Sequence, residues 1–204
     1  MSSFKSCIVA MLILCSSSSV ANATVKDDRA PAKFVVEVDT SKGRFRIQVY
    51  RKWAPNGADR FYSLVQKDFY KDCRFFRVVP GFIVQWGING DPDVQKGWKE
   101  DTIEDDAVVA SNMRGFVTYA QTQALNSRST QLFINFADNP KLDANRFAPF
   151  GRVIEGMEVV DKLNAEYAER PDQEMMQEQG NEYLQAEFPN LDYIKSIKLV
   201  PPGK

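Results

Sequence analysis

Hydrophobic and polar positions alternate in short runs along most of this chain. Residues 34–39 (FVVEVD) and 44–50 (RFRIQVY) are rich in β-branched and aromatic residues, and the turn residues 41–43 separate them. This pattern predicts a β-hairpin, with Gly43 available for a positive φ angle. Further strands are predicted by similar runs at 75–79, 82–86, 115–120, 131–136, 147–154 and 193–200.

Three segments have helical patterns instead. Between Ala58 and Val65, apolar residues recur at three- and four-residue spacing, which predicts a helix with one buried face and Asn56 as its N-cap. Residues 156–163 predict a second short helix, and the Gln- and Glu-rich stretch 171–187 predicts a third. Many short strands with few helices are typical of a mainly β sandwich or barrel rather than of βαβ units.

The first 23 residues have the pattern of a cleavable signal peptide. Lys5 precedes an apolar run at 7–15 (CIVAMLILC), and Ala21-Asn22-Ala23 fits the small-x-small cleavage rule. We therefore expect export through the secretory pathway, to a periplasm, a secretory lumen or the extracellular space. The apolar run is too short for a mature membrane span.

Two alternatives remain open for this N-terminal segment: lipid attachment at Cys15 and an uncleaved anchor. Residues 24–32 are polar and contain a proline, so they predict a flexible lead-in. The folded domain is expected over residues 33–200.

Composition excludes several kinds of chemistry. The chain has 26 Lys and Arg against 27 Asp and Glu, so no basic excess points to nucleic acid. It has no histidine, which excludes a Ser-His-Asp triad, a Cys-His dyad and His-ligated zinc. Cys73 is the one cysteine beyond the N-terminal apolar run, and we expect a buried free thiol. The acidic run 100–106 lacks EF-hand spacing and is interpreted as a solvated loop. We expect no cofactor and no metal.

A resemblance to a known family rests on several motifs in the same order. Residues 75–87 (FFRVVPGFIVQWG) resemble the cyclophilin signature, in which an aromatic-x-Arg leads through Pro-Gly-Phe to an apolar-x-Gln. Later family motifs are matched by SNMRG at 111–115, STQLFI at 129–134, LD at 142–143 and FAPFGRV at 147–153. The resemblance covers roughly residues 33–165 and the last predicted strand.

This resemblance implies an eight-stranded antiparallel cyclophilin-like barrel capped by two helices, with 171–187 as an extra C-terminal surface helix. It also implies a peptidyl-prolyl cis/trans isomerase, with Arg77 as the catalytic residue. The implied pocket for the substrate proline consists of Phe82, Ile83, Phe133, Leu142 and Phe150. The implied groove residues that hold the peptide backbone are Gln85, Ala120, Gln121 and Gln131.

The chain departs from the family pattern in one loop. Lys141 stands where the family usually has an aromatic residue, and Arg146 or Phe147 occupies the region of a common groove histidine. These changes keep an alternative open, a non-catalytic proline-peptide binding module or chaperone on the same fold. In either case the expected partners are proline-containing peptides and unfolded proteins, and we expect a monomer.

Overall fold

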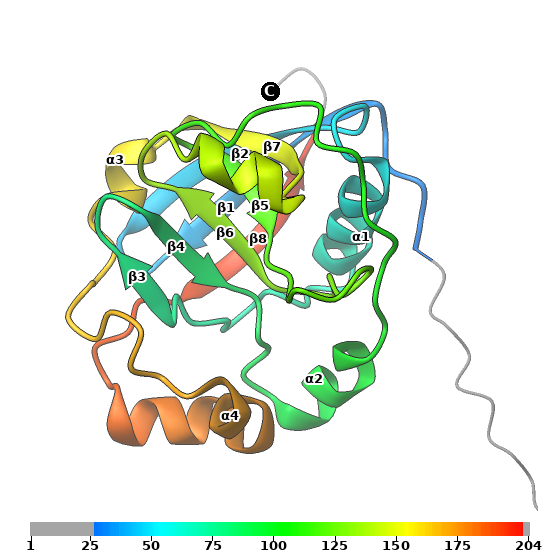
Figure 1. Cartoon of the computed structure of the whole chain (residues 1–204). Helices are drawn as coiled ribbons and strands as arrows, with labels where there is room; N and C mark the ends of the chain where they lie inside the picture. Colours follow the sequence, from blue (N-terminus) through cyan, green and yellow to red (C-terminus); the bar gives the residue numbers. More distant parts are fainter. Residues whose placement is uncertain (1–26, 202–204) are drawn as a thin grey trace, which may run out of the picture.

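One antiparallel sheet dominates the computed structural model, which describes residues 27–201 (Figure 1). Its strands are β1 (Lys33–Thr40), β2 (Gly43–Tyr50), β3 (Arg77–Val79), β4 (Ile83–Trp86), β5 (Phe116–Tyr119), β6 (Leu132–Asn135), β7 (Pro149–Glu155) and β8 (Ile194–Val200). They lie in the order β3-β4-β6-β5-β7-β2-β1-β8. The sheet curls until Arg74, before β3, and Tyr193, before β8, form a single bridge. The predicted mainly β, eight-stranded antiparallel fold is confirmed.

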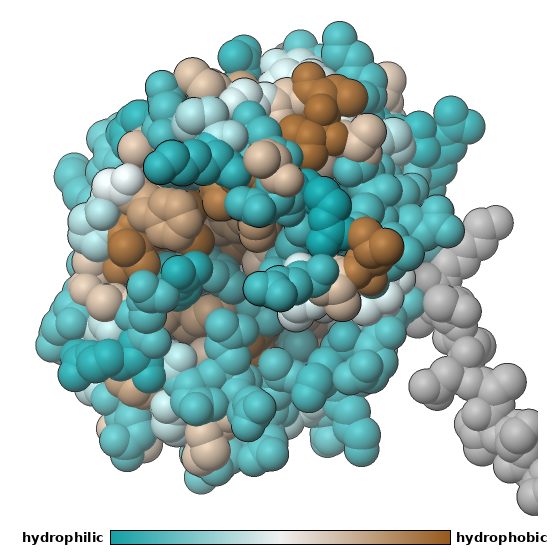
Figure 2. All heavy atoms as spheres, viewed as in Figure 1, coloured by the Kyte–Doolittle hydropathy of each residue, from teal (hydrophilic) through white to brown (hydrophobic). Residues whose placement is uncertain are grey.

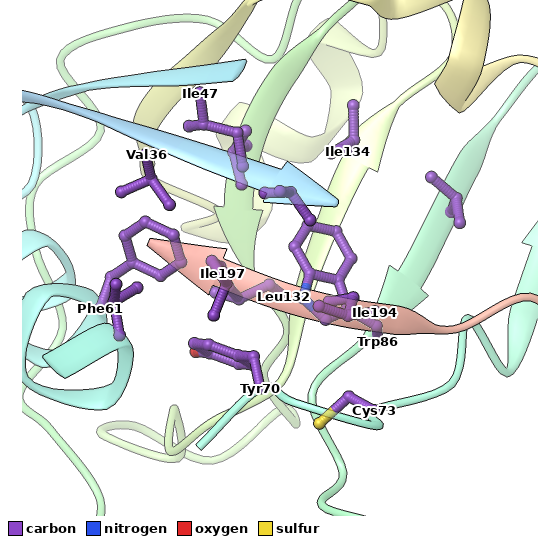
Figure 3. Close-up of a cluster of buried hydrophobic side chains, with 14 of the residues drawn as sticks. Val36, Ile47, Phe61, Tyr70, Cys73, Trp86, Leu132, Ile134, Ile194 and Ile197 are labelled. Atoms are coloured by element: carbon purple, nitrogen blue, oxygen red, sulfur yellow. The ribbon is translucent and has the colours of Figure 1, made fainter. Parts of the chain in front are cut away.

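Alternation along the strands fills the inside of the curled sheet. In the predicted hairpin, Thr40 pairs with Gly43, whose φ of 129° suits a glycine. The inward residues of both strands, such as Val36 and Ile47, are completely buried. Figure 3 shows these side chains meeting others from distant strands, such as Leu132, around a common core. Burial of this apolar surface is the main stabilising contribution to the fold.

Helix α1 (Pro55–Gln66) packs against β7 and β8, and the short α3 (Met157–Val160) packs against β2. The N-cap position of α1 belongs to Ala54, so the predicted cap at Asn56 is wrong. The carboxylate of Asp106 takes this role from a distant loop. It accepts the backbone N–H groups of Asn56 at 3.0 Å and Gly57 at 2.9 Å.

The expected C-terminal surface helix is α4 (Gln173–Glu187). It begins after Pro171 because Asp172 is its N-cap, accepting the backbone N–H of Glu174 at 2.8 Å. It packs against α2 (Pro92–Lys99), a helix that the hydrophobic pattern does not predict. A second hydrophobic cluster holds this layer and consists of Phe76, Ile88, Tyr167, Met176, Leu184 and Leu191.

The acidic run 100–106 is not the solvated loop that we expect. Asp101 pairs with the buried Arg60 at 3.2 Å, and Asp106 pairs with the buried Arg128 at 3.0 Å. Asp105 reaches Arg146 at 2.9 Å. Asp101 and Asp106 help to compensate the charges of two buried guanidinium groups, whereas Arg146 is partly exposed.

The lead-in is also tied to the domain where it is described. Asp27 pairs with Arg60 at 2.8 Å, and the backbone N–H of Ala30 donates to Asp59 at 2.9 Å. Residues 27–32 are therefore held in place, where the sequence predicts a flexible segment. The predicted signal peptide at 1–23 lies outside the described residues. Among residues 27–201, no helix is both long and apolar enough to cross a membrane.

Candidate active site

The register of three strands brings the predicted site residues into one row. Arg77 on β3 lies opposite Gln85 on β4, and Gln85 lies opposite Phe133 on β6. Successive side chains of a strand point to opposite faces. Val84 and Trp86 therefore face the core, while Ile83, Gln85 and Phe133 line a cleft on the outer face of the sheet.

This cleft has a volume of about 340 Å³. Figure 2 shows hydrophobic atoms in a hollow of the face that carries β4 and β6, surrounded by a hydrophilic surface. The cleft is lined by nine of the predicted site residues, namely Arg77, Phe82, Ile83, Gln85, Ala120, Gln121, Gln131, Phe133 and Leu142. Five further residues complete it, namely Thr122, Ser127, Ser129, Phe147 and Gln173.

Phe150 is the one predicted pocket residue that the structure places elsewhere. Its ring is completely buried in the core, with ring centroids 5.1 Å from Phe61 and 5.2 Å from Tyr119. It lies on β7, which pairs with β2 and β5 and is separated from the cleft by the sheet. The prediction that Phe150 binds the substrate proline is therefore wrong.

Phe147 occupies the position in the cleft that was predicted for Phe150. Its ring lies edge to face against Phe133, with centroids 5.7 Å apart. Arg146, just before it, has a left-handed φ of 67°, and this turn directs the chain from the 3₁₀ helix η1 (Pro140–Asn145) toward β7. Lys141 is exposed and does not line the cleft. The cleft thus keeps an aromatic cup, formed by Phe82, Phe133 and Phe147, although the loop differs from the family pattern.

A line of polar side chains crosses the cleft beside the aromatic cup. Nη1 of Arg77 donates to Oε1 of Gln85 at 3.3 Å, and Nε2 of Gln85 donates to Oε1 of Gln131 at 2.8 Å. The guanidinium of Arg77 also lies 5.8 Å from the ring centroid of Phe82, in cation–π range. Its side chain is 26% exposed, so the charge reaches the cleft without being fully solvated.

The loop that carries Leu142 is fixed by a partly buried carboxylate. Asp143 accepts hydrogen bonds from the hydroxyl of Ser111 and from the backbone and side-chain N–H groups of Asn112. Burial alone raises the pKa of Asp143, but these hydrogen bonds outweigh it, and the pKa lies below its ordinary value. The carboxylate is therefore charged at neutral pH and anchors Leu142 at the cleft.

Among residues 27–201, Arg77 is the one ionisable side chain that lines the cleft. An arginine stays protonated at any working pH, so these side chains offer fixed hydrogen-bond donors and no proton transfer. Within residues 27–201, no group of three or more His, Cys, Asp or Glu side chains is arranged to hold a metal ion. The fold and the cleft together define a cyclophilin-like barrel with an open cleft on its outer face.

Comparisons with known proteins agree with this class. The model of the family described as cyclophilin type peptidyl-prolyl cis-trans isomerase/CLD matches residues 35–180. A peptidyl-prolyl cis-trans isomerase of Acinetobacter baylyi is 37% identical over 139 residues, which are 66% of this chain and 73% of that protein. The chain therefore belongs to the cyclophilin-type family of peptidyl-prolyl cis-trans isomerases.

Solved structures support the fold independently. A crystal structure of a cyclophilin type peptidyl-prolyl cis-trans isomerase from Cryptosporidium parvum has a TM-score of 0.64 and 20% identity, and it covers 83% of this chain and 98% of that one. The same Cryptosporidium parvum protein, solved in the presence of the dipeptide Ala-Pro, has a TM-score of 0.62 and 19% identity and covers 82% and 99% of the two chains. At this identity the likeness concerns the fold alone.

Proposed function

We propose that this chain isomerises X–Pro peptide bonds in exported proteins and thereby assists their folding. The observation that carries the proposal is the row formed by Arg77, Gln85 and Phe133, which sets a fixed cation beside an aromatic cup on one cleft wall. The relative from Acinetobacter baylyi is named a peptidyl-prolyl cis-trans isomerase. The isomerase activity is common to the family, and the exported clients are our extension from the sequence.

The reaction requires only rotation about one peptide bond. Rotation about the X–Pro amide breaks no bond, but amide resonance sets a barrier of about 18–20 kcal/mol. Uncatalysed exchange takes roughly tens to hundreds of seconds. An enzyme accelerates the exchange if it binds the twisted amide better than either planar form. No proton transfer is required, in agreement with the side chains that line the cleft.

Each part of the cleft has a role in this mechanism. The rings of Phe82, Phe133 and Phe147 hold the proline, with Ile83 and Leu142 completing the apolar wall. In the twisted amide the proline nitrogen becomes pyramidal and gains a lone pair, to which a terminal N–H of Arg77 donates. Gln121 and Gln131 face the same cleft and offer amide groups to the peptide backbone.

A peptide exchange measurement tests the proposal. Two-dimensional NMR exchange on a short Ala-Pro peptide should show cis/trans interconversion accelerated by catalytic amounts of the protein, with or without EDTA. Binding of the peptide without faster exchange would instead support a non-catalytic proline-peptide binding module. Activity that disappears in EDTA and returns with added metal would contradict the mechanism.

The export part of the proposal has its own test. It rests on the charged start, the apolar run 7–15 and Ala21-Asn22-Ala23. N-terminal sequencing of protein recovered outside the cytoplasm, from cells that express the full chain, should begin at or near Thr24. Recovery of intact Met1, or of a lipid-modified Cys15, would contradict cleavage after Ala23.

A further inference from the structure

The guanidinium of Arg77 has a partner that does not belong to the strand row. Glu169 lies 92 positions further along the chain, and its Oε2 accepts from Nε of Arg77 at 2.8 Å. The same oxygen lies 2.7 Å from Nη2 of Arg77. Glu169 itself does not line the cleft, so its contact with the site passes through the arginine.

The backbone around Glu169 is built to keep this carboxylate in place. The backbone N–H of Val78, next to Arg77 on β3, donates to the carbonyl of Ala168 at 3.0 Å. Ala168 has a left-handed φ of 51°, a conformation that costs free energy in a residue with a Cβ atom. Tyr167 is buried in the second hydrophobic cluster together with Phe76. Residues on both sides of the ion pair are therefore fixed to each other.

The contacts of Arg77 divide its donors between three partners. Nε and Nη2 face Glu169, Nη1 donates to Gln85, and the guanidinium lies over the ring of Phe82. A guanidinium has five N–H donors, so each terminal nitrogen keeps a second N–H for substrate. Gln173, the first residue of α4, lines the cleft close behind Glu169 in sequence. The stretch from Glu169 to the first residue of α4 thus contacts the site twice, through Arg77 and at Gln173.

We propose that Glu169 is a positioning residue of the isomerase, which holds the guanidinium of Arg77 in the orientation that the twisted amide requires. Glu169 binds the guanidinium at Nε and Nη2, and Gln85 binds it at Nη1. The N–H groups that remain free therefore point in a fixed direction. Without these two contacts, a long arginine side chain samples several rotamers, and most of them point its donors away from the substrate. This proposal rests on the isomerase activity described above.

The test compares Glu169→Gln and Glu169→Ala with the wild-type protein. The pair is partly exposed, and we expect kcat/KM for the Ala-Pro peptide to fall about three- to tenfold, the scale of a partly solvated charge-assisted contact. The fall should appear in kcat rather than KM, and Glu169→Asp should recover part of it. Glu178→Gln on the exposed side of α4 is the matched control and should change neither constant.

A double-mutant cycle separates positioning from a structural role. In an Arg77→Ala background, Glu169→Gln should have no further effect, because the group that it positions is absent. In the wild type, the ¹⁵N–¹H resonance of Arg77 Nε should be sharp and protected, and Glu169→Gln should shift and broaden it. The double-mutant cycle and the Arg77 Nε resonance can both be interpreted even if the variant is less stable. If the wild-type protein itself shows no exchange activity, the proposed isomerase function is wrong, which is a different outcome.

Three outcomes would overturn the proposal. Glu169→Gln with wild-type activity would show that the pair is incidental. Higher activity in Glu169→Gln would show that the carboxylate holds Arg77 away from substrate. An equal loss in the wild-type and Arg77→Ala backgrounds would assign Glu169 to the stability of the segment.

Discussion

The side-chain amide of Gln85 donates to Gln131 at 2.8 Å, while its oxygen accepts from Arg77 at 3.3 Å. Gln85 is only 6% exposed, so its own amide group is largely shielded from water. A single strand residue therefore connects the proposed catalytic arginine to Gln131, another residue that lines the cleft. The direction of the Gln85 amide is fixed because each of its two ends has one suitable partner.

Removing this bridge should reduce turnover more than it reduces binding. In Gln85→Ala, Arg77 and Gln131 both lose a partner, and we expect kcat/KM to fall by about tenfold, equivalent to roughly 1.4 kcal/mol. The exchange rate of an Ala-Pro peptide measures this effect. Gln48→Ala is a suitable control because Gln48 lies on β2, outside the cleft. Equal losses in both variants would argue against a specific role of Gln85.

Substitution of Phe150 should affect stability, whereas substitution of Phe147 should affect substrate binding. Phe150→Ala empties a completely buried position and should lower the free energy of unfolding by about 3–5 kcal/mol. Phe147→Ala should leave stability almost unchanged and raise KM, because it opens the apolar cup. Urea unfolding of both variants measures the stability loss, and peptide exchange kinetics measure the change in KM. A larger stability loss at Phe147 than at Phe150 would reverse our assignment of core and cleft.

The Asp143 carboxylate should make the stability of the loop depend on acidity. Its pKa is lowered in the folded protein, so its contribution is complete above the unfolded pKa of about 3.9 and is lost as the pH falls through the folded pKa. Asp143→Asn should be less stable than wild type by about 1–2 kcal/mol at pH 7, from weakened hydrogen bonds. Urea unfolding at pH 7 and pH 3 should show this difference shrinking in acid. A difference that grows in acid would contradict the sign of the shift.

Catalysis itself should hardly respond to pH near neutrality. Within the part of the chain that the structure describes, Arg77 is the one ionisable side chain that lines the cleft, and the full sequence has no histidine. We therefore expect kcat/KM to be constant within about twofold between pH 6 and pH 8, because no catalytic group changes its charge there. A bell-shaped profile in this range would indicate a general acid or base that the mechanism lacks.

The alternating pattern was sufficient to predict all eight strands, because each has one face in a continuous core. It did not predict α2, whose buried residue is Gln95 rather than an apolar side chain. Gln95 accepts the backbone N–H of Asn89 at 2.8 Å, a contact that hydrophobic periodicity does not register. The fold was therefore predictable where burial is apolar and was missed where burial is polar.

The site was predictable where the motifs lie on paired strands. Phe150 was misassigned because motif order does not say which face of β7 a residue occupies, and the register of β7 shifts against both neighbouring strands. The sequence does not point to Glu169, because its partner Arg77 is 92 positions away and Glu169 lies beyond the last of the motifs on which the resemblance rests. Such a pair forms only when the second hydrophobic cluster brings the segment onto the edge of β3.

The central claim is that Arg77 accelerates rotation of the X–Pro bond by donating to the twisted amide. Cis/trans exchange of an Ala-Pro peptide should be measured by NMR with the wild-type protein, Arg77→Ala and Arg77→Lys, at matched concentrations of folded protein. We predict that Arg77→Ala lowers kcat/KM by about 10²–10³, the scale for losing one preorganised transition-state donor. Arg77→Lys should recover only a small part, because an ammonium lacks the planar set of donors. Exchange at the wild-type rate in Arg77→Ala would contradict the account.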